Sequence, residues 1–485
     1  MNRGDPADTP DTSTDTPDTP HTAHELSEGY RRGTFSPVDV VDEHLDRIER
    51  FEPELNAFVI VDDDGARAEA AASAARWAAG EQRGQLDGVP LTIKDIIAVF
   101  GFATGEGSAV GSGELANEDH PVVARTREAG MVILGKTTTS EFGWKGITDS
   151  QAHGITRNPI DLDRTPGGSS GGAAASLAAG IGTVAHGSDG GGSIRIPASY
   201  CGLVGLKPTF GRVPQHPVDS PFVSLVSNGP LARSVHDAAL FLNVVSQPDP
   251  RDWHAAPYDQ RDWRVGLDDG VRGVRIGFTT DLGGATTEPE VIAACTAAVE
   301  QLESLGAHVE TVGPVFDPLR PTFESYWKAG FAARLRSIPE ERWPELDPGF
   351  LTLAQQGLDV GVANYYAGHA ARAQLVRELK AFHSDYDLLI TPTMPSTAPP
   401  VDTIYHSADF DRWEHAVPFT VPFNLTGQPA ASMPVGTDSR GLPVGLQIVG
   451  DHWTEALVLR GMRAVEQAVG WSWSPTRMSG RLQKI

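Results

Sequence analysis

The chain has 485 residues, of which 40% are hydrophobic and 21% charged, so its composition is that of an ordinary globular protein with a large core. Asp and Glu number 63 against 39 Lys and Arg, and the formal net charge is −24. Such an acidic surface repels phosphate backbones, which argues against nucleic acid as a partner.

The two cysteines, Cys201 and Cys295, imply no disulfide framework and cannot form a four-thiolate metal site. The N-terminus has no basic segment followed by an apolar one, as a secretory signal requires. The longest run of low polarity, residues 173–185, is mostly Ala and Gly and is far shorter than the ~20 apolar residues of a membrane span. We therefore expect a cytoplasmic protein without a membrane segment.

Residues 1–22 repeat Asp, Thr and Pro and have no apolar side chains to bury, so they are predicted to form a disordered acidic tail. One domain is expected over residues 23–480. Ser36 and Pro37 are typical of a helix start, and a strand over 56–61 and an Ala-rich helix over 66–79 follow. Gly80 is expected to end that helix.

Between residues 88 and 239, short apolar strands alternate with helices and Gly-rich turns. Residues 89–94 and 131–136 are predicted buried strands, and 120–130 the helix between them. Further strands are predicted at 274–278, 308–312, 387–395 and 441–450, with a mainly helical segment at 320–385 and a last helix at 454–469. This alternation predicts an α/β fold with helices on both faces of a sheet.

Three segments carry the candidate chemistry. The first, GVPLTIKD, ends an apolar strand on Lys94; the second, TPGGSSGG, contains Ser169; the third, GSDGGGSIRIPA, contains Ser193. Taken singly, a lysine at a strand end is usually solvated, and a Gly/Ser run can be a flexible linker. A linker, however, rarely opens directly onto an Ala-rich helix, as the second segment does.

Together these segments resemble the amidase signature family. The likeness continues in residues 135–146, 154–159, 228–237, 387–395 and 423–450, and it covers roughly residues 25–470, with a signature core at about 85–240. The resemblance implies one α/β/α body around a large mixed, mostly parallel twisted sheet. Thr138 and Gly190 depart from the family pattern, in which many relatives have Asn and Thr, respectively; neither position is a predicted nucleophile, base or bridge.

The resemblance also implies the roles of three side chains. Ser193 is the nucleophile, and Lys94 is a neutral base that acts through the hydroxyl of Ser169. Burial disfavours an ammonium group and lowers the pKa of a lysine, which makes that role chemically reasonable. In this family the bridging serine follows a cis peptide bond, here Gly168–Ser169.

The glycines before Ser193 suit an oxyanion hole, because backbone N–H groups without intervening side chains can converge on one oxygen. We expect Gly190, Gly191, Gly192 and Ser193 to supply these donors. Structural support of the two loops is expected from Gly168, Ser170, Asp189 and Arg195.

Two other motif matches are rejected. Residues 130–137 fit the phosphate-binding pattern GxxxxGK[ST], but the residues between the glycines are MVIL, which favour a strand rather than a phosphate-cradling turn. Residues 167–171 fit the GxSxG nucleophile elbow, which would make Ser169 the nucleophile and require a downstream histidine such as His452.

The expected reaction is amide hydrolysis through an acyl-enzyme, with no metal or organic cofactor. The substrate is expected to be a small or medium aryl or alkyl amide; esters and carbamates are open to the same chemistry. Its pocket is expected from residues 104–108, 142–144, 214–226 and 320–370, with the aromatic side chains Phe222, Phe323, Tyr326, Trp327, Phe331 and Tyr365.

Two other functions stay open. The A subunit of glutamyl-tRNA amidotransferase has the same signature but belongs to a complex, and a catalytically inert relative would be a binding module. We expect a stand-alone monomeric or homodimeric hydrolase.

Overall fold

The computed structural model describes residues 20–485 except 112, 219–221, 223, 283–285, 317–319 and 403–416. Most of the predicted tail lies outside the described residues. Its last three residues do not: Pro20 is buried, and Thr22 is the N-cap of α1 (Ala23–Arg32). The ordered body therefore begins earlier than residue 23, because a helix cap and its packing extend beyond the helix. None of the helices among the described residues has the length and apolar character to cross a membrane.

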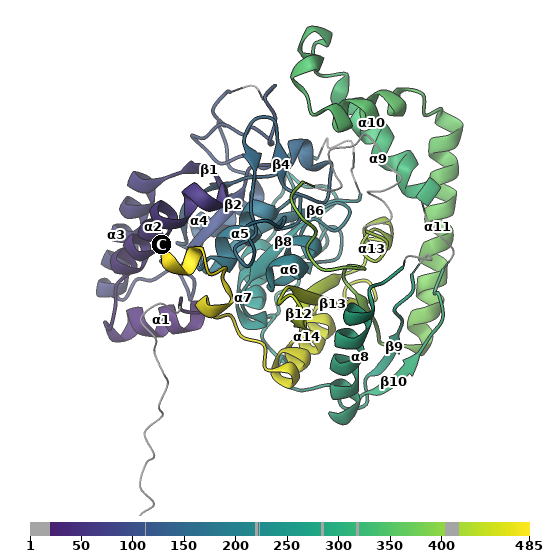
Figure 1. Ribbon diagram of the computed structural model, residues 1–485. Helices are drawn as coiled ribbons and strands as arrows, with labels where there is room; N and C mark the ends of the chain where they lie inside the picture. The colour runs from purple at the N-terminus through teal and green to yellow at the C-terminus, as the bar shows by residue number, and fades with distance from the viewer. Residues whose placement is uncertain are drawn as a thin grey trace, which may run out of the picture.

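A twisted sheet runs through the middle of the molecule (Figure 1). In the described chain it has eleven strands in the order β1-β3-β2-β6-β8-β7-β12-β13-β11-β9-β10. Their bounds are β1 Phe58–Val61, β2 Pro90–Lys94, β3 Val132–Thr137, β6 Val184–Asp189, β7 Val204–Lys207, β8 Ser227–Ala232, β9 Arg275–Phe278, β10 His308–Thr311, β11 Leu388–Pro392, β12 Ala430–Thr437 and β13 Pro443–Gly450. The strands β4 (Asp149–Ser150) and β5 (Gly154–Ile155) pair separately.

The sheet is mixed, as predicted, but it is not mostly parallel. Parallel pairing joins β3, β2 and β6 on one side and β11, β9 and β10 on the other. From β6 through β8, β7, β12 and β13 to β11, every described neighbour is antiparallel. In the sequence, the alternation of strands and helices is visible only for the strands at the two sides of the sheet. The central strands include the β12–β13 hairpin, which needs no helical crossover.

Helices cover both faces of the sheet, as predicted. The helices α4, α7, α8 and α14 pack together on one face, and α2, α3, α5 and α6 cover the other. Their bounds are α2 Pro37–Leu55, α3 Asp63–Ala79, α4 Pro121–Glu128, α5 Gly171–Ala178, α6 Arg195–Cys201, α7 Val235–Val245, α8 Pro289–Ser304 and α14 Glu455–Val469; α13 is Pro422–Leu425. Successive side chains of β3 point to opposite faces of the sheet and pack into different cores: Val132 and Leu134 into one, and Ile133 into the other.

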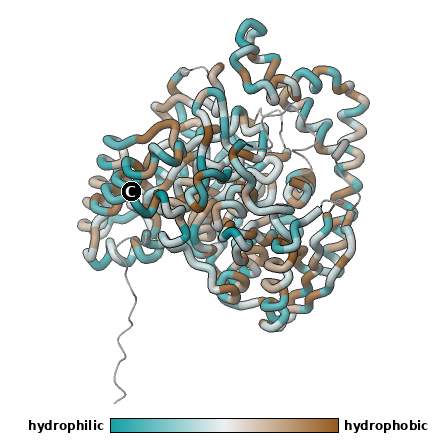
Figure 2. The backbone as a smooth tube through the Cα atoms, viewed as in Figure 1, coloured by the Kyte–Doolittle hydropathy of each residue, from teal (hydrophilic) through white to brown (hydrophobic). Residues whose placement is uncertain are grey.

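The predicted helical segment forms α9 (Arg320–Leu335), α10 (Pro348–Leu358) and α11 (Val362–Asp385). These helices form a separate layer at one side of the molecule (Figure 1). Figure 2 shows that hydrophobic and hydrophilic residues alternate along them, in keeping with helices that bury one face. Their buried face joins residues of the main body in a core of its own, which contains Trp327, Phe331 and Phe350 from the helices and Phe142 and Trp144 from the body.

Candidate active site

The site lies where two neighbouring parallel strands end. The strand β2 ends at Lys94 and β6 at Asp189, and the register pairs Ile93 with His186. Because parallel neighbours end at the same edge of a sheet, Lys94 lies beside the end of β6, where the next loop begins. Ser193 belongs to that loop.

Lys94 is completely buried. Its Nζ donates to Oγ of Ser169 at 2.7 Å and to Oγ of Ser188 at 3.0 Å. Burial lowers the pKa of Lys94 to about 7, against a smaller opposing effect of the Asp189 charge. Near neutral pH, a large fraction of this amine is therefore unprotonated and able to accept a proton.

The Ser169 segment begins with a cis peptide bond between Gly168 and Ser169. Residue 168 must be glycine, because a Cβ there would lie 2.3 Å from the carbonyl oxygen of Ile147. The next residue, Ser170, precedes α5; its Oγ donates to the carbonyl of Ser188 at 3.2 Å and its N–H to the carbonyl of Ser193 at 3.3 Å. These two bonds hold the two serine loops together.

The glycine loop has one donor fewer than the sequence predicted. The N–H of Gly192 donates to Oδ1 of Asp189 at 2.7 Å, so it is not available to an oxyanion, and the prediction is wrong for this residue. No described residue accepts a hydrogen bond from the N–H groups of Gly190, Gly191 or Ser193. These three N–H groups therefore have no acceptor within the described part of the protein.

Asp189 and Arg195 form an ion pair at 2.9 Å in which both side chains are fully buried. Burial alone would raise the pKa of Asp189, but the charge and hydrogen bonds of Arg195 hold it below its ordinary value. The remaining guanidinium donors are satisfied by the Thr420 carbonyl, Gln447 and Asn424. This network fixes the loop that carries Ser193, and it explains how a buried pair of charges is tolerated.

A cavity of about 400 Å³ opens above these serines. Its polar floor contains Ser169, Ser188 and Ser193. Its walls come from all four predicted segments, the fourth of them through α9, and include Glu106, Phe142, Gly143, Gln215, Phe222, Val226, Trp327, Phe331 and Arg334. Ser193 itself is only 8% exposed, and the exposed part faces this enclosed space.

Half of the predicted aromatic side chains do not line the cavity. Phe323 is buried against Trp327, with ring centroids 5.0 Å apart. Tyr326 and Tyr365 pack edge to face on each other at 5.3 Å. A helix presents only part of its circumference to a cavity, and the sequence does not tell which aromatic side chains of α9 lie on that part.

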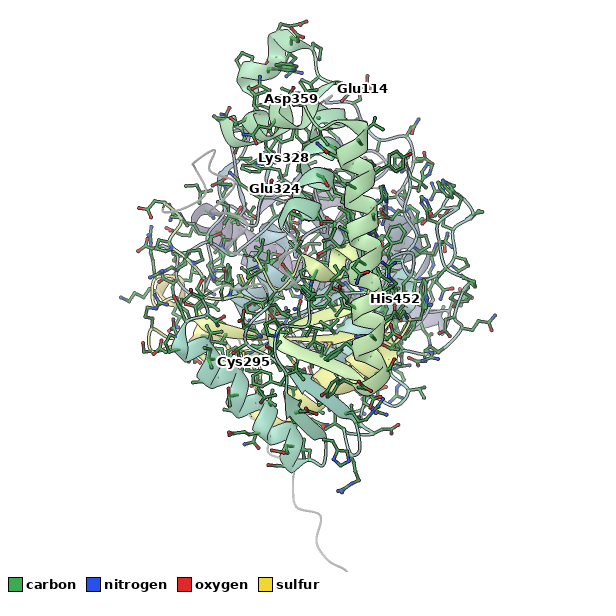
Figure 3. The ribbon with its side chains drawn as sticks, turned by 90° about the vertical axis from the view of Figure 1, so that its right-hand side faces the viewer. Glu114, Cys295, Glu324, Lys328, Asp359 and His452 are labelled. Atoms are coloured by element: carbon green, nitrogen blue, oxygen red, sulfur yellow. The ribbon has the colours of Figure 1, made fainter. Side chains whose placement is uncertain are left out.

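The rejected motifs have other structural roles. Lys136 lies within β3, as the strand prediction requires, and forms a buried ion pair with Asp95 at 2.6 Å. His452 is not among the cavity residues; it lies beside the C-terminal half of α11 (Figure 3), and its Nε2 contacts the carbonyl oxygen of Thr426 at 2.7 Å. The described residues include no group of three or more His, Cys, Asp or Glu that could hold a metal ion.

Sequence reasoning missed Ser188, which contacts Lys94 directly. The residue stands in the same motif as Asp189 and Ser193, but its place beside Lys94 depends on the register of β2 on β6, which the sequence does not state. The predicted pocket segments 104–108 and 320–370 contain Glu106 and Arg334, but the carboxylate and the guanidinium that these residues bring to the cavity wall were not predicted.

Comparisons with known proteins show the family of the chain. The family model described as amidase matches residues 39–459. An acylamidase of Rhodococcus erythropolis is 34% identical over 459 residues, 92% of this chain and 95% of that protein. The A subunit of a glutamyl-tRNA(Gln) amidotransferase of Roseiflexus castenholzii is 37% identical over 473 residues, 92% of this chain and 95% of that protein. The crystal structure of a bacterial aryl acylamidase of the amidase signature enzymes superposes with a TM-score of 0.87 at 31% identity, over 93% of this chain and 97% of the other.

Proposed function

The chain belongs to the amidase family and is a hydrolase of carbon–nitrogen bonds, and from that premise we propose that it is a stand-alone acylamidase that cleaves aryl or alkyl amides through an acyl-enzyme on Ser193. The observation that carries the proposal is the contact between Lys94 and Ser169 at the floor of the cavity that also contains Ser193. We expect it to act as a monomer or homodimer in the cytoplasm.

The proposed proton path starts at the neutral amine of Lys94, which accepts the hydroxyl proton of Ser169. Ser169 in turn takes the proton of Ser193, whose Oγ attacks the amide carbonyl carbon. When the carbon–nitrogen bond breaks, the departing amine receives a proton through Ser169, and Ser193 is left acylated. Water then attacks the acyl group by the same path and releases the carboxylic acid.

The oxyanion that forms in each step needs fixed donors. We assign this role to the N–H groups of Gly190, Gly191 and Ser193. The N–H of Gly192 instead holds the loop to Asp189. The mechanism requires no metal or organic cofactor.

The substrate class follows from the walls of the cavity. Its apolar part is surrounded by four aromatic side chains, those of Phe142, Phe222, Trp327 and Phe331. The ring centroid of Phe222 lies 5.0 Å from that of Trp327 and 4.7 Å from that of Phe331. Such a wall favours an aromatic or aliphatic group over a highly polar one. Two of the compared proteins are acylamidases by name, which supports the same choice. Esters and carbamates would react by the same acyl transfer.

The proposal is tested with the purified chain alone. It should hydrolyse anilides and short alkyl amides, and a fluorophosphonate probe should add once to the wild type and not at all to Ser193→Ala, as read by intact-mass spectrometry. An adduct that persists in Ser193→Ala and maps to Ser169 would support the nucleophile-elbow assignment instead. Failure to hydrolyse any amide, with no adduct, would favour the inert binding module.

A second candidate is the glutamine-hydrolysing A subunit of a tRNA amidotransferase, and it is favoured by the identity of such subunits over most of the chain. The two candidates differ in what they need. A stand-alone acylamidase turns over anilides without a partner, whereas a subunit of that kind would prefer glutamine and would gain activity from partner subunits.

A further inference from the structure

Glu106 and Arg334 are the only acidic or basic side chains, histidine apart, among the described residues that line the catalytic cavity. They come from two distant segments of the chain: Glu106 from the loop after β2, and Arg334 from the last turn of α9. The two side chains form an ion pair. The pair is only partly buried, since 38% of the Arg334 side chain and 28% of the Glu106 side chain are exposed.

Glu106 is held in place by the body of the protein. Its loop is anchored by Lys136, which donates to the Ala103 carbonyl and to Thr104 Oγ1, both at 2.9 Å, and by Asp95, which accepts from the N–H of Gly105 at 3.1 Å. Glu106 itself has a φ of 52°, a left-handed conformation that is unfavourable for a residue with a side chain. The loop therefore presents its carboxylate at a fixed place.

Arg334 is less completely satisfied. One Nη binds Glu106, and the guanidinium lies over the ring of Phe142 with its Cζ 4.6 Å from the ring centroid. Its Nε is buried and has no hydrogen-bond partner in the described structure. A buried N–H without an acceptor is unfavourable, so a bound ligand that places an acceptor atom beside this Nε would be stabilised there.

Phe142 and Gly143 connect this donor to the reacting groups. A Cβ on Gly143 would lie 3.1 Å from Oγ of Ser169, so the residue is directly against the proton-transferring serine. Its neighbour Phe142 carries the guanidinium of Arg334 on its ring, and the Phe142 N–H donates to the carbonyl of Glu106 at 2.7 Å. A substrate whose amide lies at Ser169 can thus rest along Phe142 and reach Arg334 with its far end.

We propose that Arg334 is a specificity-determining residue whose Nε–H binds a neutral acceptor oxygen at the end of the substrate away from the scissile amide. This inference rests on the proposed function, since it names the class of amide. A ketone, ether or ester oxygen can use the free donor and leave the ion pair intact. A carboxylate would compete with Glu106 for the guanidinium and would leave one of the two carboxylates without a partner.

The experiment measures binding to the Ser193→Ala variant by calorimetry, so that it does not depend on turnover. The probes are 4-acetylacetanilide and 4-isopropylacetanilide, which have nearly the same shape and differ in one acceptor oxygen. The acetyl compound should bind about fivefold tighter or more, in keeping with one net hydrogen bond of about 1 kcal/mol. In Ser193→Ala/Arg334→Lys, which keeps the positive charge but has no Nε–H, this ratio should fall below about twofold.

Arg336→Lys is the matched control, because Arg336 lies two residues further along and is exposed. It should leave the ratio unchanged. Equal binding of the two probes in Ser193→Ala, no binding of either, or a ratio that survives Arg334→Lys overturns the inference, and so does tighter binding of 4-acetamidobenzoate, which would identify an anion site. Turnover by the wild type is measured separately. A wild type that binds with this preference but hydrolyses nothing would contradict the proposed function and leave the binding role standing.

Discussion

Lys94 and Lys207 are alike in burial but not in contacts. Both are completely enclosed, and desolvation lowers the pKa of each to about 7. Lys94 reaches the hydroxyls of Ser169 and Ser188, which line the cavity, whereas Nζ of Lys207 donates at 3.0 Å to the carbonyl of its neighbour Pro208. The protein thus contains two lysines of similar basicity, of which one contacts the proposed proton path. This contrast provides an internal control for the role of the base.

We expect Lys94→Met to lower kcat by about 10³-fold, because a positioned general base contributes roughly 10²–10⁴. The variant should fold at least as stably as the wild type, since methionine has no amine to desolvate. Lys207→Met should keep more than a third of the activity. Anilide turnover and thermal unfolding measure both effects, and substantial activity in Lys94→Met would remove this lysine from the mechanism.

The pH dependence should report the same lysine. Protonated Lys94 cannot accept a proton, so kcat/KM should rise about tenfold per pH unit at low pH and level off above about 7, the value to which burial lowers the pKa of Lys94. The profile of Lys207→Met should have the same inflection. If that inflection moved or vanished in Lys207→Met, the titration would belong to Lys207 and not to Lys94.

Ser188 is expected to position the amine of Lys94 rather than to react. Its Oγ accepts a hydrogen bond from that amine, and such a bond favours the charged form. In Ser188→Ala, the pKa of Lys94 should therefore fall further, and the inflection of kcat/KM should move to lower pH while kcat falls about tenfold. Fluorophosphonate labelling of Ser193 should persist. A simple loss of activity without a shift of the pH profile would mean that Ser188 only packs.

Much of the site could be predicted from the sequence, because its chemistry is concentrated in short motifs. Lys94, Ser169 and Ser193 were predicted from those motifs, and they come together in the structure; their catalytic roles stay predictions. The glycine run was predicted as a source of N–H donors, and only Gly192 differs, since the carboxylate of Asp189 turns back onto it. That interaction depends on the side-chain direction of a residue at a strand end.

The rest depended on relationships between distant segments. The antiparallel centre of the sheet was not apparent, because β7 pairs with β12, which follows it only after about half the length of the domain. Likewise, Glu106 and Arg334 meet only after α9 packs over the loop that follows β2. Sequence periodicity indicates which face of an element is buried, but not which element covers it.

The pair of Asp189 and Arg195 should matter for stability. Asp189→Asn keeps the shape of the side chain but leaves the buried guanidinium without its counter-charge, which typically reduces the free energy of unfolding by about 3–5 kcal/mol. Asp268→Asn is the control, because Asp268 pairs with Arg463 at the surface, where an ion pair contributes about 0–1 kcal/mol. Urea denaturation of both variants measures the difference. Equal losses would mean that the buried pair is not needed to hold the loop.

The N-terminal boundary gives the last prediction. Oγ1 of Thr22 accepts from the N–H of Glu25 at 3.2 Å, and the Glu25 carboxylate accepts from the Thr22 N–H at 2.7 Å, so the two form a capping box for α1. Loss of an N-cap typically reduces the free energy of unfolding by about 1 kcal/mol. A chain without residues 2–22 should therefore have a lower free energy of unfolding than one without residues 2–19, as measured by urea denaturation. The difference should be about 1 kcal/mol or somewhat more, because Pro20 is also buried. Thr22→Ala in the full chain separates the cap from the packing of Pro20 and should account for most of the loss.

Both truncated chains should hydrolyse anilides at the wild-type rate, since α1 does not contribute to the cavity. Equal stability of the two truncated chains would show that the first helix is held by its packing alone and that its cap contributes nothing measurable.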